Sequence, residues 1–166
     1  MSIVSSFVAA DFNVPTVLET DEYRLRMLTV NDVVKDFDAV ITSSEHLKGI
    51  FPPPSTWPEG LTLEQDLIDL GWHQKEFQRR SSFAYTMMSL DESCCLGCVY
   101  FYPSDRQGYD AYALLWARQS ELARGLEERL LTDVRQWLTD RWPFESIAFP
   151  GRDVSWDSWF ALPKRD

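Results

Sequence analysis

The segment from residue 109 to residue 151 restricts the fold of this chain more than any other. An apolar run at 110–117 predicts a strand, and apolar side chains then recur every three or four positions from Ser120, which predicts a long amphipathic helix. Pro143 ends that helix, because the residue before a proline disfavours helical backbone. A short buried strand follows at 146–149. This order predicts a right-handed crossover between two parallel strands.

The first half of the chain predicts two helices and a three-stranded meander. Alternating apolar residues predict a strand at 23–28, and a helix follows at 33–41. A capping box at Thr62 opens a second helix that ends near Arg79. The three strands of the meander are expected at 83–88, 96–102 and 110–117. The chain is therefore expected to be α/β (α+β), with a mixed, mostly antiparallel sheet flanked by helices.

Length and charge narrow the class of protein. The 166 residues fit one domain, 1–166, with an irregular lead-in at 1–18 and a short tail at 152–166. A net charge of −10 argues against nucleic-acid binding, which needs a basic face. No run of 18 apolar residues exists, and the N-terminus lacks the basic start of a signal peptide, so we expect a cytoplasmic protein without membrane contact.

Three cysteines, Cys94, Cys95 and Cys98, fall at the start of an expected strand. A zinc site would need a fourth ligand, and the surrounding sequence offers none. In a regular strand Cys94 and Cys98 would face one side of the sheet and Cys95 the other. We therefore expect reduced, partly buried thiols and no metal.

The order of elements resembles the GNAT N-acetyltransferase fold over residues 18–151. The opening at 18–33 is similar to the first strand and helix of the ribosomal-protein-type N-acetyltransferase branch, with a Leu-Glu-Thr, an Arg-flanked strand and a Thr-x-x-Asp turn. The segment Cys95–Val99 resembles the glycine-bearing third strand of that family. The resemblance implies an enzyme that transfers an acetyl group from acetyl-coenzyme A (acetyl-CoA) to a primary amine.

The cofactor signature of the GNAT family is Gln/Arg-x-x-Gly-x-Gly/Ala at the start of the third helix, where backbone amides hold the pyrophosphate. It aligns here with Leu122, Gly125 and Glu127, of which only Gly125 matches. Two neighbouring arginines could bind phosphate, or the helix could simply be capped by Ser120 and its acidic first turn. The resemblance implies these cofactor-binding residues: Leu115, Trp116, Ala117, Arg118, Arg124 and Gly125.

Acetyl transfer to an amine needs a base, a group that polarises the thioester carbonyl and an acid for the leaving thiolate. Asp110 is the candidate base, with Glu92, His46 and His73 as alternatives, and backbone amides at 114–117 could polarise the carbonyl. Tyr112 is the candidate acid, with Tyr102 and Tyr109 as alternatives, and each of these side chains could instead have only a structural role. Ser155 is the one match to the family's Asn-x-x-Ser motif at 152–155. The resemblance also implies a sheet lacking the family's last two strands, so that a partner in a homodimer could supply a wall of the acceptor site.

Two aromatic segments are candidate binding surfaces. The resemblance places the acceptor beside the proline-rich loop at 49–60, with Phe51 and Trp57 as substrate-binding residues; these rings could equally pin the loop to the core. The tail carries an apolar stripe that would seal the sheet edge or form a dimer contact, consisting of Trp156, Trp159 and Phe160.

Two functions of different classes follow. The first is an N-acetyltransferase acting on an unidentified amine. The second is a catalytically degenerate module for ligand binding or protein interaction, which the eroded pyrophosphate signature and the aromatic tail favour. A third hypothesis replaces acetyl-CoA with another acyl-bearing or nucleotide-bearing ligand.

Overall fold

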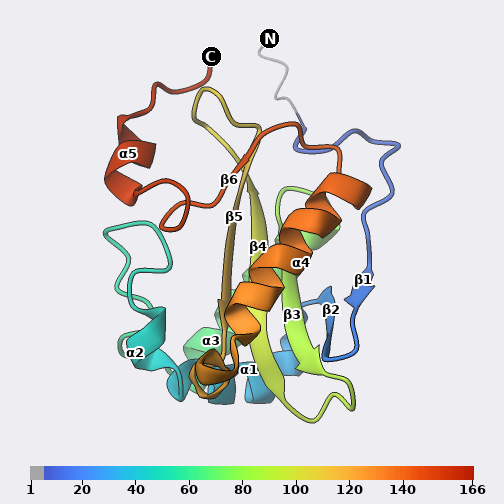
Figure 1. Cartoon of the computed structure of the whole chain (residues 1–166). Helices are drawn as coiled ribbons and strands as arrows, with labels where there is room; N and C mark the ends of the chain where they lie inside the picture. Colours follow the sequence, from blue (N-terminus) through green and yellow to red (C-terminus); the bar gives the residue numbers. More distant parts are fainter. Residues whose placement is uncertain (1–5) are drawn as a thin grey trace.

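A six-stranded sheet in the order β1 to β6 forms the centre of the molecule (Figure 1), in a computed structural model that describes residues 6–166. Neighbouring strands from β1 to β5 are antiparallel, and β6 is parallel to β5. This confirms the predicted mixed sheet, the meander and the parallel pairing of the two crossover strands. The strands are β1 (Val17–Glu19), β2 (Tyr23–Met27), β3 (Phe83–Ser89), β4 (Cys95–Pro103), β5 (Ala111–Ala117) and β6 (Ile147–Ala148).

Helices cover both faces of the sheet. Helix α4 crosses one face, while α1 and α3 lie on the other, and α5 sits near the C-terminus beyond β6 (Figure 1). The middle strands are consequently buried on both sides, which explains their nearly continuous apolar sequences. The helices are α1 (Val33–Ile41), α2 (Ser44–Leu47), α3 (Leu63–Arg79), α4 (Leu126–Arg141) and α5 (Trp156–Ala161), with short 3-10 turns η1 (Val30–Asp32) and η2 (Gln119–Arg124). No helix in the described part of the chain is long and apolar enough to cross a membrane.

The helix predicted from Ser120 proves to be two elements, η2 and α4. Gly125 separates them with a left-handed backbone, φ 74°, which an α-helix cannot contain. Gly125 itself is the N-cap of α4, so the prediction that Ser120 caps this helix is wrong. Leu122 consequently lies in η2, outside the apolar face of α4.

The prediction that Cys95 and Cys98 face opposite sides of the sheet is also wrong. The β3–β4 register shifts between Met87 and Met88, so β4 gains one residue and its alternation changes phase. Cys95 and Cys98 are therefore both buried in the core on the α1 side of the sheet. Gly97 lies within this irregularity, and a Cβ there would sit 2.1 Å from the Trp116 carbonyl oxygen, so only glycine fits.

The structure differs from the sequence-based expectation in further details. The lead-in at 1–18 was expected to be irregular, but β1 begins at Val17; its residues 1–5 lie outside the described part of the chain. Helix α2 was not anticipated. On α3, Leu63 and Leu67 are exposed, whereas Asp66 and Leu70 are buried toward the sheet.

The aromatic tail packs on its own chain. Helix α5 forms as predicted, and the Trp159 ring contacts the rings of Tyr109 and Tyr112 at 5.5 and 5.4 Å between centroids. Trp159 is buried there, which confirms that the stripe covers the sheet beside β5. Phe160 stays exposed and stacks on Trp156.

Candidate active site

Strands β5 and β6 pair at the beginning of β5, and the unpaired end of β5 leads toward the start of α4. The two strands pair only through Ala111 and Tyr112, so the remainder of β5 has a backbone edge without a strand partner. The predicted cofactor residues Leu115 to Ala117 lie on this edge, and Gly125 lies one short turn further along the chain. The fold thus brings the predicted cofactor residues to one end of the sheet. An open strand edge beside a helix N-terminus offers backbone N–H groups to a ligand.

The chain itself covers this edge. The backbone N–H of Ala117 donates to Oε1 of Glu127 at 3.0 Å, and Arg152 Nη2 donates to the Leu115 carbonyl oxygen at 2.9 Å. Glu127 also contacts His46 Nε2 at 2.6 Å and Arg152 Nη2 at 3.5 Å. We name these three residues, His46, Glu127 and Arg152, the edge cluster.

The edge cluster corrects the expectation for Glu127. The signature alignment placed its carboxylate in front of a pyrophosphate, but the side chain turns into the fold and its residue is only 8% exposed. Its partners come from α2 and from the segment after β6, 81 residues before it and 25 residues after it. No local sequence pattern connects such positions, so sequence reasoning missed this cluster.

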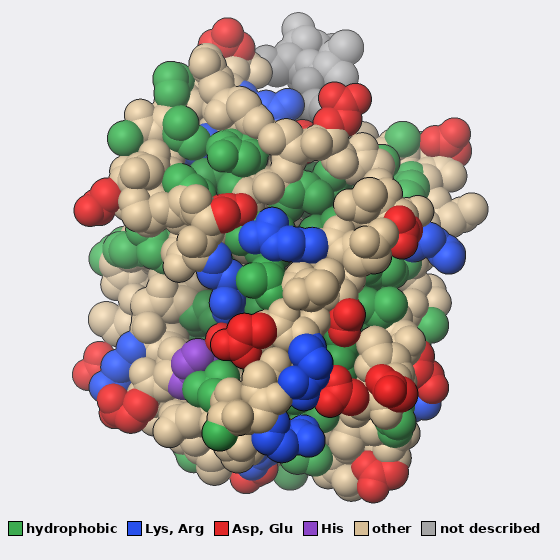
Figure 2. All heavy atoms as spheres, viewed as in Figure 1, with side chains coloured by type: hydrophobic (Ala, Val, Ile, Leu, Met, Phe, Trp, Pro, Cys, Tyr) green, Lys and Arg blue, Asp and Glu red, His purple; other side chains and the backbone are tan. Residues whose placement is uncertain are grey.

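The arginines near α4 are already paired with carboxylates. Arg118 donates to Asp38 at 2.6 Å, and Arg124 donates to Glu121 at 2.6 Å. On this face of the molecule, basic and acidic side chains lie beside one another and form no basic patch (Figure 2). Within residues 6–166 no side chain caps the N-terminus of α4, and the carboxylates of Glu127 and Glu128 lie in its first turn.

The three predicted catalytic residues lie away from these groups. Both carboxylate oxygens of Asp110 accept backbone N–H groups, from Glu145 at 2.9 Å and Ser146 at 2.8 Å. Asp110 precedes β5 and Ala117 ends it, and about 3.3 Å per strand residue puts them roughly 20 Å apart. Asp110 therefore fixes the β5–β6 crossover, and the structure does not bring it to the open strand edge.

Tyr112 and Ser155 also have structural partners. The Ser155 hydroxyl accepts the Ser158 N–H at 3.1 Å and so caps α5. The Tyr112 ring stacks on Tyr102, and burial raises the pKa of Tyr112 to about 12. A phenol with that pKa keeps its proton at neutral pH, and it lies at the same end of β5 as Asp110.

A cavity of about 390 Å³ lies on the face of the sheet that α1 and α3 cover. Residues of these two helices, of the proline-rich loop and of β4 line it. The predicted substrate-binding residues Phe51 and Trp57 both line it, with their ring centroids 5.1 Å apart. The Phe51 ring also packs on Tyr100, at 5.2 Å. The aromatic rings of the loop thus both anchor it to the sheet and form a cavity wall, and we name this space the aromatic cavity.

Buried acids line the aromatic cavity, and sequence reasoning missed them. Asp36 and Asp66 are 3% and 2% exposed, and burial raises the pKa of Asp36 to about 7 and that of Asp66 to about 9. His73 also lines the cavity, and burial lowers its pKa. One signal was present: Asp66, Leu70 and His73 recur at i, i+4 and i+7, so a buried Leu70 implies that the other two face the sheet.

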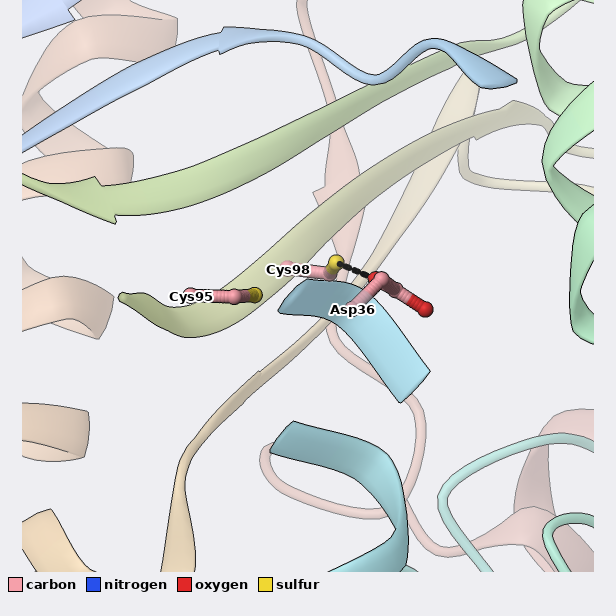
Figure 3. A group of neighbouring side chains, drawn as sticks. All are labelled: Asp36, Cys95 and Cys98. Atoms are coloured by element: carbon pink, nitrogen blue, oxygen red, sulfur yellow. Dashed lines mark hydrogen bonds between the residues drawn. The ribbon is translucent and has the colours of Figure 1, made fainter. Parts of the chain in front are cut away.

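Asp36 also meets the two cysteines of β4. One carboxylate oxygen of Asp36 and the sulfur atoms of Cys95 and Cys98 lie within 4.8 Å of one another (Figure 3). Carboxylate and thiolate are ligands that zinc accepts. Here the Cys98 thiol donates to Asp36 Oδ1 at 3.5 Å, and burial raises the pKa of Cys98, which keeps that thiol protonated. The expectation of no metal stays a prediction.

No family model and no curated protein matches this sequence. Solved structures do match. The ribosomal-protein-S5-alanine acetyltransferase from Vibrio fischeri is 16% identical, with a TM-score of 0.59 over 75% of this chain and 67% of that chain. The ribosomal L7/L12 alpha-N-protein acetyltransferase RimL, in its apo form, is 14% identical, with a TM-score of 0.59 over 78% and 67% of the two chains.

A third structure is the microcin C7 self-immunity acetyltransferase MccE, solved in complex with acetyl-CoA and AMP. It is 13% identical, with a TM-score of 0.60 over 76% of this chain and 68% of that chain. At such identities the likeness establishes the fold. With its meander, its diverging β5–β6 pair and its crossover helix, this chain has the fold of the GNAT acetyltransferases.

Proposed function

We propose that this chain is an N-acetyltransferase that transfers an acetyl group from acetyl-CoA to a primary amine. The observation that carries the proposal is the end of β5 beyond its pairing with β6, which leads toward the N-terminus of α4. It occurs in a fold shared with MccE, whose structure contains acetyl-CoA. The aromatic cavity supports an acceptor site, since Phe51 and Trp57 line it as the acceptor hypothesis requires.

The start of α4 fits the phosphates of this cofactor. Its first-turn amides have no side-chain cap, and the Arg129 guanidinium lies 3.2 Å from where a Cβ on Gly125 would be, which places a cation beside these amides. Arg124 lies in the preceding turn and is exposed, so its guanidinium can exchange Glu121 for a phosphate. When bound, acetyl-CoA supplies the activated acetyl group.

The edge cluster occupies backbone groups of β5 that an acetyl donor would need to contact. The Ala117 N–H can polarise an acyl carbonyl only after the Glu127 carboxylate releases it. His46 and Arg152 hold that carboxylate in place, so we propose that Glu127 must leave the strand edge before transfer. Glu127 is then a positioning residue whose side chain competes with the acetyl donor.

Calorimetric titration of acetyl-CoA into the wild-type protein tests this function directly. We expect binding, and we expect Glu127→Ala to tighten it by about tenfold, which corresponds to ~1.4 kcal/mol. Asp140→Ala is the control, since Asp140 is an exposed carboxylate at the opposite end of the same helix, away from the proposed phosphate site. Absence of heat with both folded wild type and Glu127→Ala would rule out the acetyltransferase.

The same edge cluster favours a second candidate, a binding module without catalysis. If its contacts persist, the strand edge stays closed, and neither acetyl-CoA binding nor release of the coenzyme thiol would occur. Such a module in the cytoplasm could form homodimers through the exposed ring of Phe160. Sedimentation of wild type against Phe160→Ser tests that contact, and a monomeric wild type would eliminate it.

A further inference from the structure

The aromatic cavity has the wall composition of a site for an organic cation. Trp57, Trp72 and Tyr100 contribute aromatic rings, and aromatic faces attract cations. Asp36, Asp66 and Asp69 contribute carboxyl groups. Within the described part of the chain, no lysine or arginine lines the cavity. A cavity of about 390 Å³ is large enough for a small ligand.

Asp36 and Asp66 together present at most one negative charge at pH 7. Burial and the neighbouring Asp36 carboxyl group raise the pKa of Asp66 to about 9, so Asp66 keeps its proton and Asp36 is the group that ionises. Both belong to helices packed on the same face of the sheet, α1 and α3, and both line the cavity. The remaining charge has no cation among the lining residues. A ligand with one positive charge would neutralise it.

Two buried polar atoms at the cavity lack hydrogen-bond partners. They are Oδ2 of Asp66 and Nδ1 of His73. Asp66 is 2% exposed, so this oxygen can neither meet bulk water nor find a donor on the described chain. Buried polar groups normally have partners, and an unpartnered acceptor beside a cavity is satisfied when a ligand brings an N–H donor.

We propose that the aromatic cavity binds a small apolar primary amine in its ammonium form, with the Asp36–Asp66 pair as its counter-ion and hydrogen-bond acceptor. The ring walls take the apolar body of the ligand and the acids take its head. A carboxylate ligand would face three aspartates and is excluded by repulsion. Only in calling this amine the acetyl acceptor does the inference rest on the proposed function.

Binding of three probes of similar size tests the site without acetyl-CoA. They are 2-phenylethylamine, 2-phenylethanol and 3-phenylpropionate, which are cationic, neutral and anionic at pH 7. Tryptophan fluorescence follows binding, since Trp57 and Trp72 line the cavity. We expect the amine to bind about tenfold more tightly than the alcohol, and the carboxylate to bind least. Equal affinities, or tightest binding of the carboxylate, would overturn the proposal.

Variants that change the charge of Asp36 and Asp66 test whether this pair is the counter-ion of the amine or only supports the fold. Asp66→Asn keeps one charge on Asp36, and its amide can donate to that carboxylate, so amine affinity should stay within about threefold of wild type. The double variant Asp36→Asn with Asp66→Asn removes the charge and should weaken amine binding about tenfold, with 2-phenylethanol unaffected. Asp140→Asn, on the exposed side of α4, is the control. Unchanged amine affinity in the folded double variant would refute the counter-ion.

The result of the probe-binding experiment can be distinguished from the result of the acetyl-CoA titration. If the amine binds and acetyl-CoA does not, the cavity is a ligand site on a chain without transferase activity. If acetyl-CoA binds and the three probes do not discriminate by charge, the cavity inference fails and the transferase survives. Should the double variant not fold, the order of the three probes on wild type still decides.

Discussion

The aromatic cavity and the open edge of β5 lie on one sheet, but they differ in whether their buried polar groups have hydrogen-bond partners. At the strand edge, Glu127 and Arg152 satisfy the backbone groups of Ala117 and Leu115. In the cavity, Oδ2 of Asp66 is buried and has no hydrogen-bond partner among residues 6–166. A fully paired region contributes stability, whereas an unpaired buried group costs stability until a ligand meets it. A ligand at the strand edge would have to displace Glu127, whereas a ligand in the cavity would meet an unpaired acceptor.

Trp116 joins the two regions, and its loss should have the largest effect. Its strand forms the open edge, while its indole N–H donates to the Tyr100 hydroxyl at 3.1 Å on the cavity side. The side chain is fully buried, so Trp116→Ala should lower the free energy of unfolding by about 3–5 kcal/mol. Urea denaturation measures this. Trp72→Ala, at a 62% exposed cavity residue, is the control and should change it by less than about 0.5 kcal/mol.

Removing the carboxylate at the strand edge should destabilise the protein, because it leaves the Ala117 N–H without its acceptor. We expect Glu127→Ala to lower the free energy of unfolding by about 1–3 kcal/mol. The exposed neighbour Glu128 provides the control as Glu128→Ala, which should change stability little. Equal stability of the two variants would mean that the edge is not closed in solution.

Removing a carboxyl group from the cavity should raise the free energy of unfolding. Asp66→Asn keeps a donor toward Asp36 and removes an ionisable group, so we expect a gain of the order of 1 kcal/mol at pH 8. Urea denaturation of the variant beside wild type measures it. A loss of stability in Asp66→Asn would show that the cavity is as well satisfied as the edge.

The sign of the pH dependence sharpens this expectation. The pKa of Asp66 is about 9 in the folded protein against 3.8 for an ordinary aspartate, so the folded state binds more protons between these values. Stability should therefore fall as the pH rises from 7 to 9, and less steeply in Asp66→Asn. The lowered pKa of His73 acts below this window and does not interfere.

The smallest effect is expected at the surface pair near α4. Glu121→Gln removes the partner of the exposed Arg124, and surface ion pairs contribute little, so unfolding should change by less than about 0.5 kcal/mol. Acetyl-CoA affinity should nevertheless rise, because the guanidinium becomes available to phosphate. Calorimetry on Glu121→Gln and on the control Glu45→Gln measures the difference. Equal affinities would separate Arg124 from the cofactor site.

Much of the fold could be predicted, because its signals are local. Alternation gave β2, the capping box at Thr62 gave the start of α3, and Pro143 gave the end of α4. The errors arose where one residue changes the backbone locally. Gly125 divided an apparently continuous helix, and the irregularity beside Gly97 turned Cys95 to the other face. Periodicity arguments assume a regular backbone, so they fail at such positions.

The candidate site was predicted only in part. Phe51 and Trp57 line one cavity, and the residues predicted to bind the cofactor lie at one end of β5. Asp110, despite its promising position beside a strand, is engaged by two backbone amides. Sequence position alone cannot show whether a carboxylate is available for chemistry, because its partners depend on how the chain closes on itself.

The sequence by itself determined the order of strands and helices, the antiparallel meander and the parallel crossover, since these follow from patterns within a few residues. Only the tertiary structure decided what the polar groups do. It set Glu127 beside His46 and Ala117, and it joined Asp36 with Asp66 from two helices. The physical reason is that hydrogen bonds and shifted pKa values depend on burial and on neighbours distant in sequence, which the packing of the whole chain alone provides.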